Sequence, residues 1–273
     1  MVWDEVKQCL VLSDAVCLVT GGAAGVGAAL VSSLLTENAQ HVAFLDIEEK
    51  KGAALETQLN AKFGALRAKF IKCDIANEDE LTRAYKLVTD KYRRLDVVVN
   101  NAAVLSRDGE NSGRMVDVNF KASVNSTFKA VEAMSAENGG SGGVVVNISS
   151  LLALNQDSRL AVYSATKAAV LQFTVTLGKE PFYTNSKVRL LTVCPGPTDT
   201  AIYHRQNLQN HPAHLTQPYF QKQSVESAVL GIIEVIKTGA SGSVWKVADD
   251  EPAQDISQHV KKGFTVFSSV VKK

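Results

Sequence analysis

Two pairs of residues in this chain place a phenol four positions before an ammonium: Tyr163 with Lys167 in YSATK, and Tyr183 with Lys187 in YTNSK. A free phenol titrates near pH ~10, which is too high for a base at neutral pH. A nearby ammonium favours the phenolate and lowers that pKa, so such a pair could take a proton from an alcohol or return it to a carbonyl. This chemistry requires both side chains to share one face of an element.

The two pairs differ in their local sequence. The stretch 159–178, RLAVYSATKAAVLQFTVTLG, contains no helix breaker, and residues four apart on a helix lie on the same face. The second pair follows Pro181 and contains Asn185–Ser186, a composition typical of a turn before a strand. We therefore predict that the first pair is stacked on a helix and that the second pair is a coincidence of spacing.

A second group of residues could hold a dinucleotide. LVTGGAAGVGAAL places glycines 21, 22, 25 and 27 between an apolar run and a helical stretch. Such glycines permit a tight turn and let backbone N–H groups approach a pyrophosphate at a helix N-terminus. Asp46 lies 19 residues after Gly27, where a carboxylate can accept hydrogen bonds from the ribose hydroxyls and repels a 2′-phosphate. Ile47 follows, and 21–27 contains no Arg or Lys, so the pattern predicts NAD rather than NADP.

Alternating strands and helices must position these residues. The predicted strands are the apolar runs 15–20, 41–46, 69–74, 95–100, 143–149, 188–194 and 242–247. The predicted helices are 26–37, 48–62, 77–93, 114–136, 161–180 and 224–238. Continuously apolar strands are covered on both faces, and β–α alternation predicts a parallel sheet. We expect an α/β protein with a single-domain Rossmann fold over 1–273, with about seven parallel strands and helices on both faces; no element is predicted for 252–273.

Composition excludes several other classes of protein. The chain has 273 residues, of which 45% are hydrophobic and 21% charged, with a net charge of +1. This balance gives no electrostatic case for nucleic acid or membrane surfaces, and no apolar run approaches the ~20 residues of a membrane span. The scattered cysteines Cys9, Cys17, Cys73 and Cys194 predict reduced core thiols rather than a metal site. The expectation is a cytoplasmic enzyme without a metal, and the loop histidines His204, His211 and His214 are expected to be solvated surface.

The order of these motifs resembles the short-chain dehydrogenase/reductase family over about residues 12 to 250. The glycine spacing is TGxxxGxG, and CDI at 73–75 is similar to the family's adenine-contacting turn. NNAA at 100–103 resembles its NNAG, with Ala103 in place of the glycine, and CPGPTDT at 194–200 resembles its nicotinamide loop. Asn119, Ser150, Tyr163 and Lys167 fall on the family's catalytic positions.

The resemblance implies a role for each catalytic position. Ser150, rather than Ser149, would bond the substrate oxygen, and Tyr163 would be the general base. Lys167 would also hold the nicotinamide ribose, and Asn119 would support a water that links Lys167 to solvent. The expected cofactor-binding residues are Gly21, Gly25, Val26, Gly27, Asp46, Ile47, Cys73, Asp74, Ile75, Asn101, Ala102, Tyr163, Lys167, Pro195, Gly196, Thr198 and Thr200.

The substrate side is expected to be apolar. Its predicted lip consists of 151–162 and the loop 198–222, within an irregular stretch 195–223; the loop's apolar and aromatic residues are Ile202, Tyr203, Leu208, Leu215, Tyr219 and Phe220. Ser150, Leu160 and Tyr163 are the predicted substrate residues, which suits a lipophilic alcohol or ketone. Within the family, the chain is most similar to the branch of NAD-dependent hydroxyprostaglandin and insect alcohol dehydrogenases. The former have a glutamine where this chain has Leu160, so a less polar alcohol (isoprenoid, fatty or steroid-like) is as plausible as a prostanoid.

Two other functions fit parts of the pattern. An NAD(H)-binding regulatory protein would keep the glycines and Asp46 but could lose the serine, tyrosine or lysine, all of which are present here. An NADPH-dependent carbonyl reductase is disfavoured by the carboxylate of Asp46. Family members form homodimers or homotetramers through the helices expected at 114–136 and 161–180, so the resemblance implies such an assembly.

Overall fold

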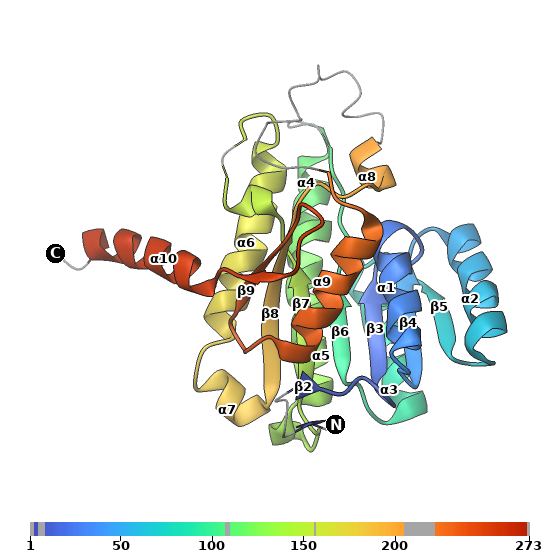
Figure 1. The fold of residues 1–273 in the computed structure, drawn as a ribbon. Helices are drawn as coiled ribbons and strands as arrows, with labels where there is room; N and C mark the ends of the chain where they lie inside the picture. The colour runs from blue at the N-terminus through green and yellow to red at the C-terminus, as the bar shows by residue number, and fades with distance from the viewer. Residues whose placement is uncertain (1–2, 5–8, 107–109, 156, 205–221, 272–273) are drawn as a thin grey trace.

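The computed structural model describes residues 3–4, 9–106, 110–155, 157–204 and 222–271. Within them, eight strands form one sheet in the order β10-β9-β8-β7-β6-β3-β4-β5 (Figure 1). The strands are β3 (Val16–Thr20), β4 (His41–Asp46), β5 (Ala68–Lys72), β6 (Val97–Asn100), β7 (Gly143–Ile148), β8 (Val188–Pro195), β9 (Val244–Val247) and β10 (Gln254–Asp255). All pairs from β3 to β9 are parallel, which confirms the predicted Rossmann fold. The antiparallel strand β10 was not predicted, and neither was a separate pair, β1 (Trp3–Asp4) with β2 (Cys9–Leu10).

Helices cover both faces of the sheet (Figure 1). They are α1 (Gly25–Thr36), α2 (Glu49–Phe63), α3 (Glu78–Tyr92), α4 (Ser112–Met115), α5 (Ala122–Met134), α6 (Ala161–Leu177), α7 (Phe182–Ser186), α8 (Ala201–His204), α9 (Val225–Thr238) and α10 (Ser257–Val271). A π-helical segment, Val116–Lys121, joins α4 to α5, so the single helix predicted over 114–136 consists of three segments. Short 3₁₀ turns, Ala136–Asn138 and Leu151–Ala153, precede and follow β7.

The core consists of two layers, one on each side of the sheet. Along β3, Cys17 and Val19 pack in the layer that contains α1 and α9. The alternate residues, Val16 and Leu18, pack in the layer that contains α3 and α5. Side chains alternate between faces along a strand, and each apolar side chain that is fully buried contributes roughly 1.5–3 kcal/mol. This burial on both faces explains why the strands are almost continuously apolar.

A buried polar network ties the central strands to two helices. Asn100 Nδ2 on β6 donates to Asn147 Oδ1 on β7 at 2.7 Å, and Asn147 Nδ2 donates to Thr174 Oγ1 on α6 at 2.9 Å. Ser126 Oγ on α5 donates to Asn100 Oδ1 at 2.5 Å. Buried polar groups are costly unless they are bonded, so this network fixes α5 and α6 against the sheet in one arrangement.

The strand order changes direction at the centre of the sheet. From β3 the chain proceeds to β4 and β5 on one side and then returns to β6 on the other. In open parallel sheets, ligands bind at the carboxyl ends of the strands beside such a switch point. The glycine turn follows β3, Asn101 follows β6, and Ser150 is the second residue after β7, so three motifs meet at this edge.

Two regions differ from the sequence-based expectation. Residues 182–186 form the short helix α7 rather than a turn, and Lys187 ends it with a φ of 57°. This left-handed residue takes Lys187 out of the helix, so it does not continue the helical face of Tyr183. Residues 257–271 form α10, which extends away from the body (Figure 1). No described helix combines the length and apolarity that a membrane span requires.

Candidate active site

A crevice of two continuous parts runs along the carboxyl ends of the strands. One part, of about 240 Å³, lies over β3 to β6, and the other, of about 220 Å³, lies over β7 and β8. Both are lined by Val26, Asn101, Ala103, Thr200 and Ile202, which join them. The first part is lined by the predicted cofactor residues Gly21, Gly25, Val26, Gly27, Asp46, Ile47, Cys73, Asp74, Ile75, Asn101, Ala102 and Thr200. The second is lined by the predicted residues Ser150, Leu160, Tyr163, Lys167, Pro195, Gly196 and Thr198.

The glycine turn packs so closely against the neighbouring backbone that side chains at its glycines would collide with protein atoms. Gly21 and Gly25 have φ values of 67° and 54°, which favour glycine. A Cβ on Gly27 would lie 2.1 Å from the carbonyl oxygen of Gly21. The N-cap residue of α1, Ala24, supplies no side-chain hydrogen bond, and the first turn contains no acid. The N-terminus of α1 therefore offers its dipole and N–H groups to an anion such as a pyrophosphate.

Asp46 connects the end of β4 to this turn. Its Oδ2 accepts a hydrogen bond from Ala23 N at 3.0 Å, and its Oδ1 accepts one from Glu48 N at 3.1 Å. An ionised carboxylate has about four lone-pair sites, so two backbone bonds leave acceptor capacity for a ribose diol. The backbone bonds also hold the carboxylate in place before a ligand arrives.

Arg114 is a cleft residue that the sequence analysis missed. It lies on α4, and its Nη2 donates to Asp74 Oδ1 at 2.8 Å. Partial burial alone would raise the pKa of Asp74, but the bonds from Arg114 and from Ala76 N outweigh it and lower that pKa. Asp74 therefore stays ionised beside the expected adenine site. No local signal in the sequence links two residues that lie forty positions apart.

Tyr163, Ser150 and Lys167 meet in the second part of the crevice. The side chains of Tyr163 and Ser150 are hydrogen-bonded to each other. Lys167 Nζ lies 5.8 Å from the centroid of the Tyr163 ring and donates to Ile148 O at 2.9 Å. Ser149 Oγ instead donates to Lys167 O at 2.8 Å, which fastens β7 to α6. The geometry thus separates two adjacent serines, one facing the phenol and one holding a helix.

The charges of this site are controlled mainly by burial. Burial raises the pKa of Tyr163 to about 12, although the hydrogen bond with Ser150 opposes this effect. Burial also lowers the pKa of Lys167 to about 8, against the opposing influence of Cys194. The expectation that the lysine lowers the phenol pKa below its ordinary value is therefore wrong for this structure. Loss of solvation disfavours both charged forms, phenolate and ammonium, and is the largest cause of both shifts.

Asn119 lies beside the site but lines neither part of the crevice. It sits in the π-helical segment, and its Nδ2 donates to Val104 O at 2.9 Å. Its Oδ1 accepts from Val104 N at 2.8 Å, and Nδ2 also approaches Thr166 Oγ1 at 3.3 Å. The side chain therefore fixes the loop after β6 to α6, one turn from Tyr163. Its expected part in holding a water stays a prediction.

Comparison with known proteins agrees with this geometry. Residues 15–211 match the sequence model of the short chain dehydrogenases. The chain is 36% identical over 187 residues to 15-hydroxyprostaglandin dehydrogenase [NAD(+)] of Macaca fascicularis, across 68% of this chain and 69% of that protein. It belongs to the short-chain dehydrogenase family. Alcohol dehydrogenase 1 of Ceratitis cosyra is 32% identical over 184 residues, across 67% and 69% of the two chains.

Solved structures of short-chain dehydrogenases share the fold. A short-chain type dehydrogenase/reductase from Mycobacterium ulcerans superposes with a TM-score of 0.74 and 28% identity, covering 87% of this chain and 90% of that one. The 3-ketoacyl-(acyl-carrier-protein) reductase from Brucella melitensis, complexed with NADH, has a TM-score of 0.76 at 20% identity, covering 87% and 98%. At that identity the second likeness concerns the fold alone.

The second part of the crevice is lined mostly by apolar side chains. Leu160 is buried at the N-cap position of α6 and lines the cavity as predicted. Leu105, Leu151 and Leu152 also line this part of the crevice. Leu151 and Leu152 lie in the predicted lip 151–162, whereas Leu105 was not predicted. Asp157 adds a carboxylate, which accepts from Arg159 Nη2 at 2.6 Å. The predicted residues Leu208, Leu215, Tyr219, Phe220, His211 and His214, and the side chains of Tyr203 and His204, lie outside the described residues.

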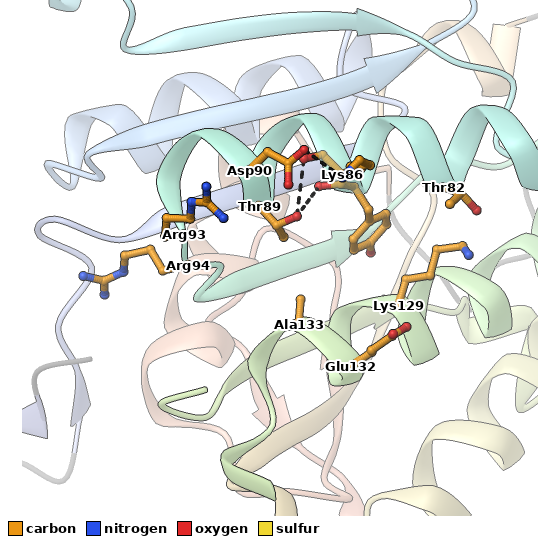
Figure 2. Close-up of a pocket in the computed structure, with 10 residues that line it drawn as sticks. Thr82, Lys86, Thr89, Asp90, Arg93, Arg94, Lys129, Glu132 and Ala133 are labelled. Carbon is orange, nitrogen blue, oxygen red and sulfur yellow. Dashed lines mark hydrogen bonds and ion pairs between the residues drawn. The ribbon is translucent and has the colours of Figure 1, made fainter. Parts of the chain in front are cut away.

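A larger hollow elsewhere has the wrong chemistry for a catalytic site. It is a groove of about 410 Å³ along α3 and α5, whose lining side chains Figure 2 shows. Lys86 Nζ pairs with Asp90 Oδ2 at 3.0 Å within the groove, and Lys129 pairs with Glu78 at 2.6 Å. Exposed pairs of this kind contribute little energy. None of the residues that end β3, β4, β6 or β7 lines this groove.

Proposed function

We propose that this chain is an NAD-dependent dehydrogenase that oxidises a lipophilic secondary or allylic alcohol to its carbonyl compound, in a single catalytic domain over 1–273. The observation that carries this proposal is the position of Tyr163, with Ser150 and Lys167, where an apolar cavity joins the dinucleotide cleft. A base at such a junction reaches the alcohol oxygen while the adjoining cleft holds the hydride acceptor. The reverse reaction, reduction of the carbonyl, uses the same groups.

The preference for NAD rests on the charges around Asp46. Its carboxylate would bond the ribose hydroxyls and repel a 2′-phosphate. Among the described residues that line the cleft, Arg114 is the cation, and it is already bonded to Asp74. The names of the hydroxyprostaglandin dehydrogenase relatives include NAD(+), which supports the same choice. Bound NAD would supply the acceptor for the hydride that leaves the alcohol carbon.

The residues of this chain would move the proton. Ser150 Oγ bonds the substrate oxygen and, through its bond with Tyr163, places that oxygen beside the phenol. Tyr163 Oη takes the hydroxyl proton as the carbon–oxygen double bond forms. Lys167, whose pKa of about 8 leaves it mostly charged at pH 7, and the positive nicotinamide ring of bound NAD would together have to favour the phenolate, against the burial that raises the pKa of Tyr163. A general base in this position typically accelerates the reaction by about 10²–10⁴-fold.

The chemical class of the substrate follows from the cavity walls. Leu105, Leu151, Leu152 and Leu160 line it, so we propose a long apolar alcohol, of isoprenoid, fatty or steroid-like kind. A buried hydrogen-bonding side chain at position 160 would select a substrate with a matching polar group. A substrate without that group would leave the side chain unpaired, at a cost of about 1–3 kcal/mol. Leu160 offers no such group.

The same proposal extends to assembly and location. We propose a homodimer or homotetramer in the cytoplasm. The described cysteines Cys17, Cys73 and Cys194 are buried free thiols, which supports a reducing compartment.

Steady-state turnover tests the proposal. The wild-type protein should reduce NAD with lipophilic secondary alcohols, and NADP should support much slower turnover. Faster turnover with NADP would favour a carbonyl reductase instead. If NADH binds but no alcohol or ketone in a broad panel reacts, the chain is a regulatory NAD(H)-binding protein and the proposal is wrong.

A further inference from the structure

Gln223 is a buried polar residue outside the lining of both parts of the crevice. It lies two residues before the start of α9, and it is only 1% exposed. Neither part of the crevice is lined by it. A buried amide is costly unless it is hydrogen-bonded, so its partners indicate what the residue holds in place.

The backbone of Gln223 pairs with the loop 194–200, which resembles the family's nicotinamide loop. Its N–H donates to Pro197 O at 2.9 Å, and its carbonyl oxygen accepts from Asp199 N at 3.0 Å. These two bonds make a parallel β-bridge between Gln223 and Thr198. The residue is therefore attached to the loop by its backbone, whatever its side chain does.

The side chain of Gln223 joins the same loop to the end of β9. Gln223 Nε2 donates to Thr198 Oγ1 at 3.0 Å and to Val247 O at 2.8 Å. Thr198 Oγ1 donates to Gly196 O at 3.0 Å, and Gly196 N donates to Val247 O at 3.0 Å. These bonds form one closed circuit through Gln223, Thr198, Gly196 and Val247, which is called the Gln223 clamp below.

The chemistry of the Gln223 clamp requires a primary amide. The amide has two N–H groups and supplies one hydrogen to each acceptor, whereas a carboxylate has no donor and a hydroxyl has one. The other polar atom, Gln223 Oε1, has no hydrogen-bond partner among the described residues. Burial of an unpaired oxygen is unfavourable, so stability alone does not account for an amide here. The position that the amide gives to the loop does.

The loop held by the Gln223 clamp faces the catalytic groups. Gly196 and Thr198 line the second part of the crevice together with Tyr163. The loop is also packed tightly behind this wall, because a Cβ on Gly196 would lie 2.8 Å from Ala248 Cβ. A change in the clamp therefore moves a wall of the crevice beside the catalytic phenol.

We propose that Gln223 is a positioning residue for the nicotinamide of NAD. Through the Gln223 clamp it holds the loop 194–200 against the nicotinamide, so that the hydride acceptor lies beside the alcohol carbon. Gln223 itself touches neither the cofactor nor the substrate. A displacement of the reacting atoms by ~1 Å can reduce a rate by ~10²-fold. The inference rests on the dehydrogenase function proposed above and adds the residue that orients its cofactor.

Calorimetric titration tests this role without requiring turnover. Gln223→Met keeps the length of the side chain but has no N–H donor, so it opens the clamp. The dissociation constant of NADH should rise by roughly 10-fold, because the loop no longer holds the nicotinamide. ADP-ribose, which is the cofactor without its nicotinamide, should bind as it binds to the wild type. An equal loss for both ligands, or no loss for either, would overturn the proposal.

Steady-state turnover provides the second measurement. In Gln223→Met, kcat for alcohol oxidation should fall by roughly 10–100-fold, whereas KM for the alcohol should change little. The number of ADP-ribose sites per chain should stay at the wild-type value. A residue that only supports the fold would lower the number of sites together with kcat, and that result would contradict a positioning role.

A double variant shows whether Gln223 acts through Thr198. Thr198→Val removes the hydroxyl of the clamp, so its combination with Gln223→Met should weaken NADH no more than the stronger single variant does. Additive losses would overturn the proposal. Gln58→Met is the matched control, because Gln58 is an exposed glutamine on α2 that lines neither part of the crevice. It should bind both ligands like the wild type.

The measurements separate the two proposals from each other. If the wild type binds NADH but oxidises no alcohol, the dehydrogenase function is wrong, while the two titrations still decide the role of Gln223. Circular dichroism checks the fold of each variant. Gln223→Glu has the same shape and no N–H donor, so it replaces Gln223→Met if the latter does not fold, with the same expected difference between NADH and ADP-ribose.

Discussion

The two parts of the crevice are built in different ways. The dinucleotide cleft is made largely by backbone: Gly21 and Gly25 have positive φ, and Gly27 leaves no room for a Cβ. The catalytic part instead depends on buried side chains, with Lys167 only 2% exposed and Ser150 8% exposed. In the proposed function, the first part would select its ligand by shape and by N–H groups, and the second part would do chemistry with groups removed from water.

This difference has an energetic consequence. Backbone shape imposes little electrostatic cost, because the N–H groups at a helix start need partners in any case. Burial raises the pKa of Tyr163 to about 12 and lowers the pKa of Lys167 to about 8, so it penalises the charged form of each group. The catalytic part therefore reduces stability for the sake of reactivity, whereas the cleft does not. Substitutions in the two parts should separate these contributions.

The largest effect is expected at the catalytic phenol. Tyr163→Phe removes the proton acceptor, so kcat should fall by ~10³-fold or more. NADH affinity should fall far less than turnover, because most of the expected cofactor-binding residues line the other part of the crevice. Tyr183→Phe is the matched control, since this tyrosine has the same spacing to a lysine but lies on the short helix α7. Turnover and a fluorescence titration with NADH check both statements; full activity of Tyr163→Phe would refute the assigned role.

The next effect is expected at the glycine turn. In Gly27→Val, the new Cβ would meet Gly21 O at 2.1 Å and Asn101 Nδ2 at 2.7 Å. Overpacking costs up to ~3 kcal/mol, so the dissociation constant of NADH should rise by roughly 100-fold. In the matched control Gly113→Val, nothing lies within 4 Å of the added Cβ, so the affinity of this variant for NADH should be unchanged. Circular dichroism identifies a variant that merely fails to fold, in which case Gly27→Ala replaces it.

A smaller effect is expected from the charge of Asp46. Asp46→Asn keeps the shape and an acceptor but removes the negative charge. Charge-assisted hydrogen bonds contribute about 1.5–3 kcal/mol, so the ratio of kcat/KM for NAD to that for NADP should fall by roughly 10–100-fold. Asp90→Asn, in the groove between α3 and α5, should leave the ratio unchanged. An unaltered ratio in Asp46→Asn would place cofactor selection elsewhere.

The smallest effect concerns stability. Burial lowers the pKa of Lys167 from 10.5 to about 8, so the folded protein bears a cost at pH 7, where both states are protonated. Lys167→Met removes this cost of ~3 kcal/mol but also loses a hydrogen bond of ~1 kcal/mol to Ile148 O. The apo variant should gain about 1–2 kcal/mol in urea unfolding at pH 7, while its turnover is lost.

The sign of the pH dependence follows from linkage. Between pH 8 and 10.5 the unfolded wild type binds more protons at this lysine than the folded wild type does. The wild type therefore gains stability as pH rises through this window, and the advantage of Lys167→Met should shrink. Lys187→Met, at an exposed lysine, should show neither effect. A variant that is less stable at pH 7 would show that the bonds of Lys167 outweigh its desolvation.

Much of the fold could be predicted from local pattern. Apolar runs, most of them rich in valine, correspond to β3 through β9 within a few residues, because strands buried on both faces have few polar positions. The helix α10 was missed although Val260, Phe264, Phe267 and Val271 have helical spacing. Helical stretches are easiest to recognise when they alternate with strands, and α10 follows the last parallel strand. The strand β10 spans only two residues, too few for any periodicity.

The candidate site was predicted unevenly. The sequence analysis named Asp46, Ser150 and Leu160, and each lines the crevice. It missed Arg114, because the contact with Asp74 joins α4 to the loop after β5. It named Asn119 as a catalytic residue; the structure shows its side-chain amide bonded to Val104, outside the lining of both parts of the crevice, so a catalytic role stays a prediction. Hydrogen bonds between distant segments leave no periodic signal.

By itself, the sequence determined the order of strands and helices, the glycine turn and the choice of Tyr163 over Tyr183. These are local properties, since backbone freedom, side-chain period and helix breakers act over a few residues. Only the tertiary structure decided how Arg114 reaches Asp74, which backbone groups hold Asn119, and how far burial moves the pKa values of Tyr163 and Lys167. Desolvation depends on everything packed around a group, so it exists only once the chain has folded.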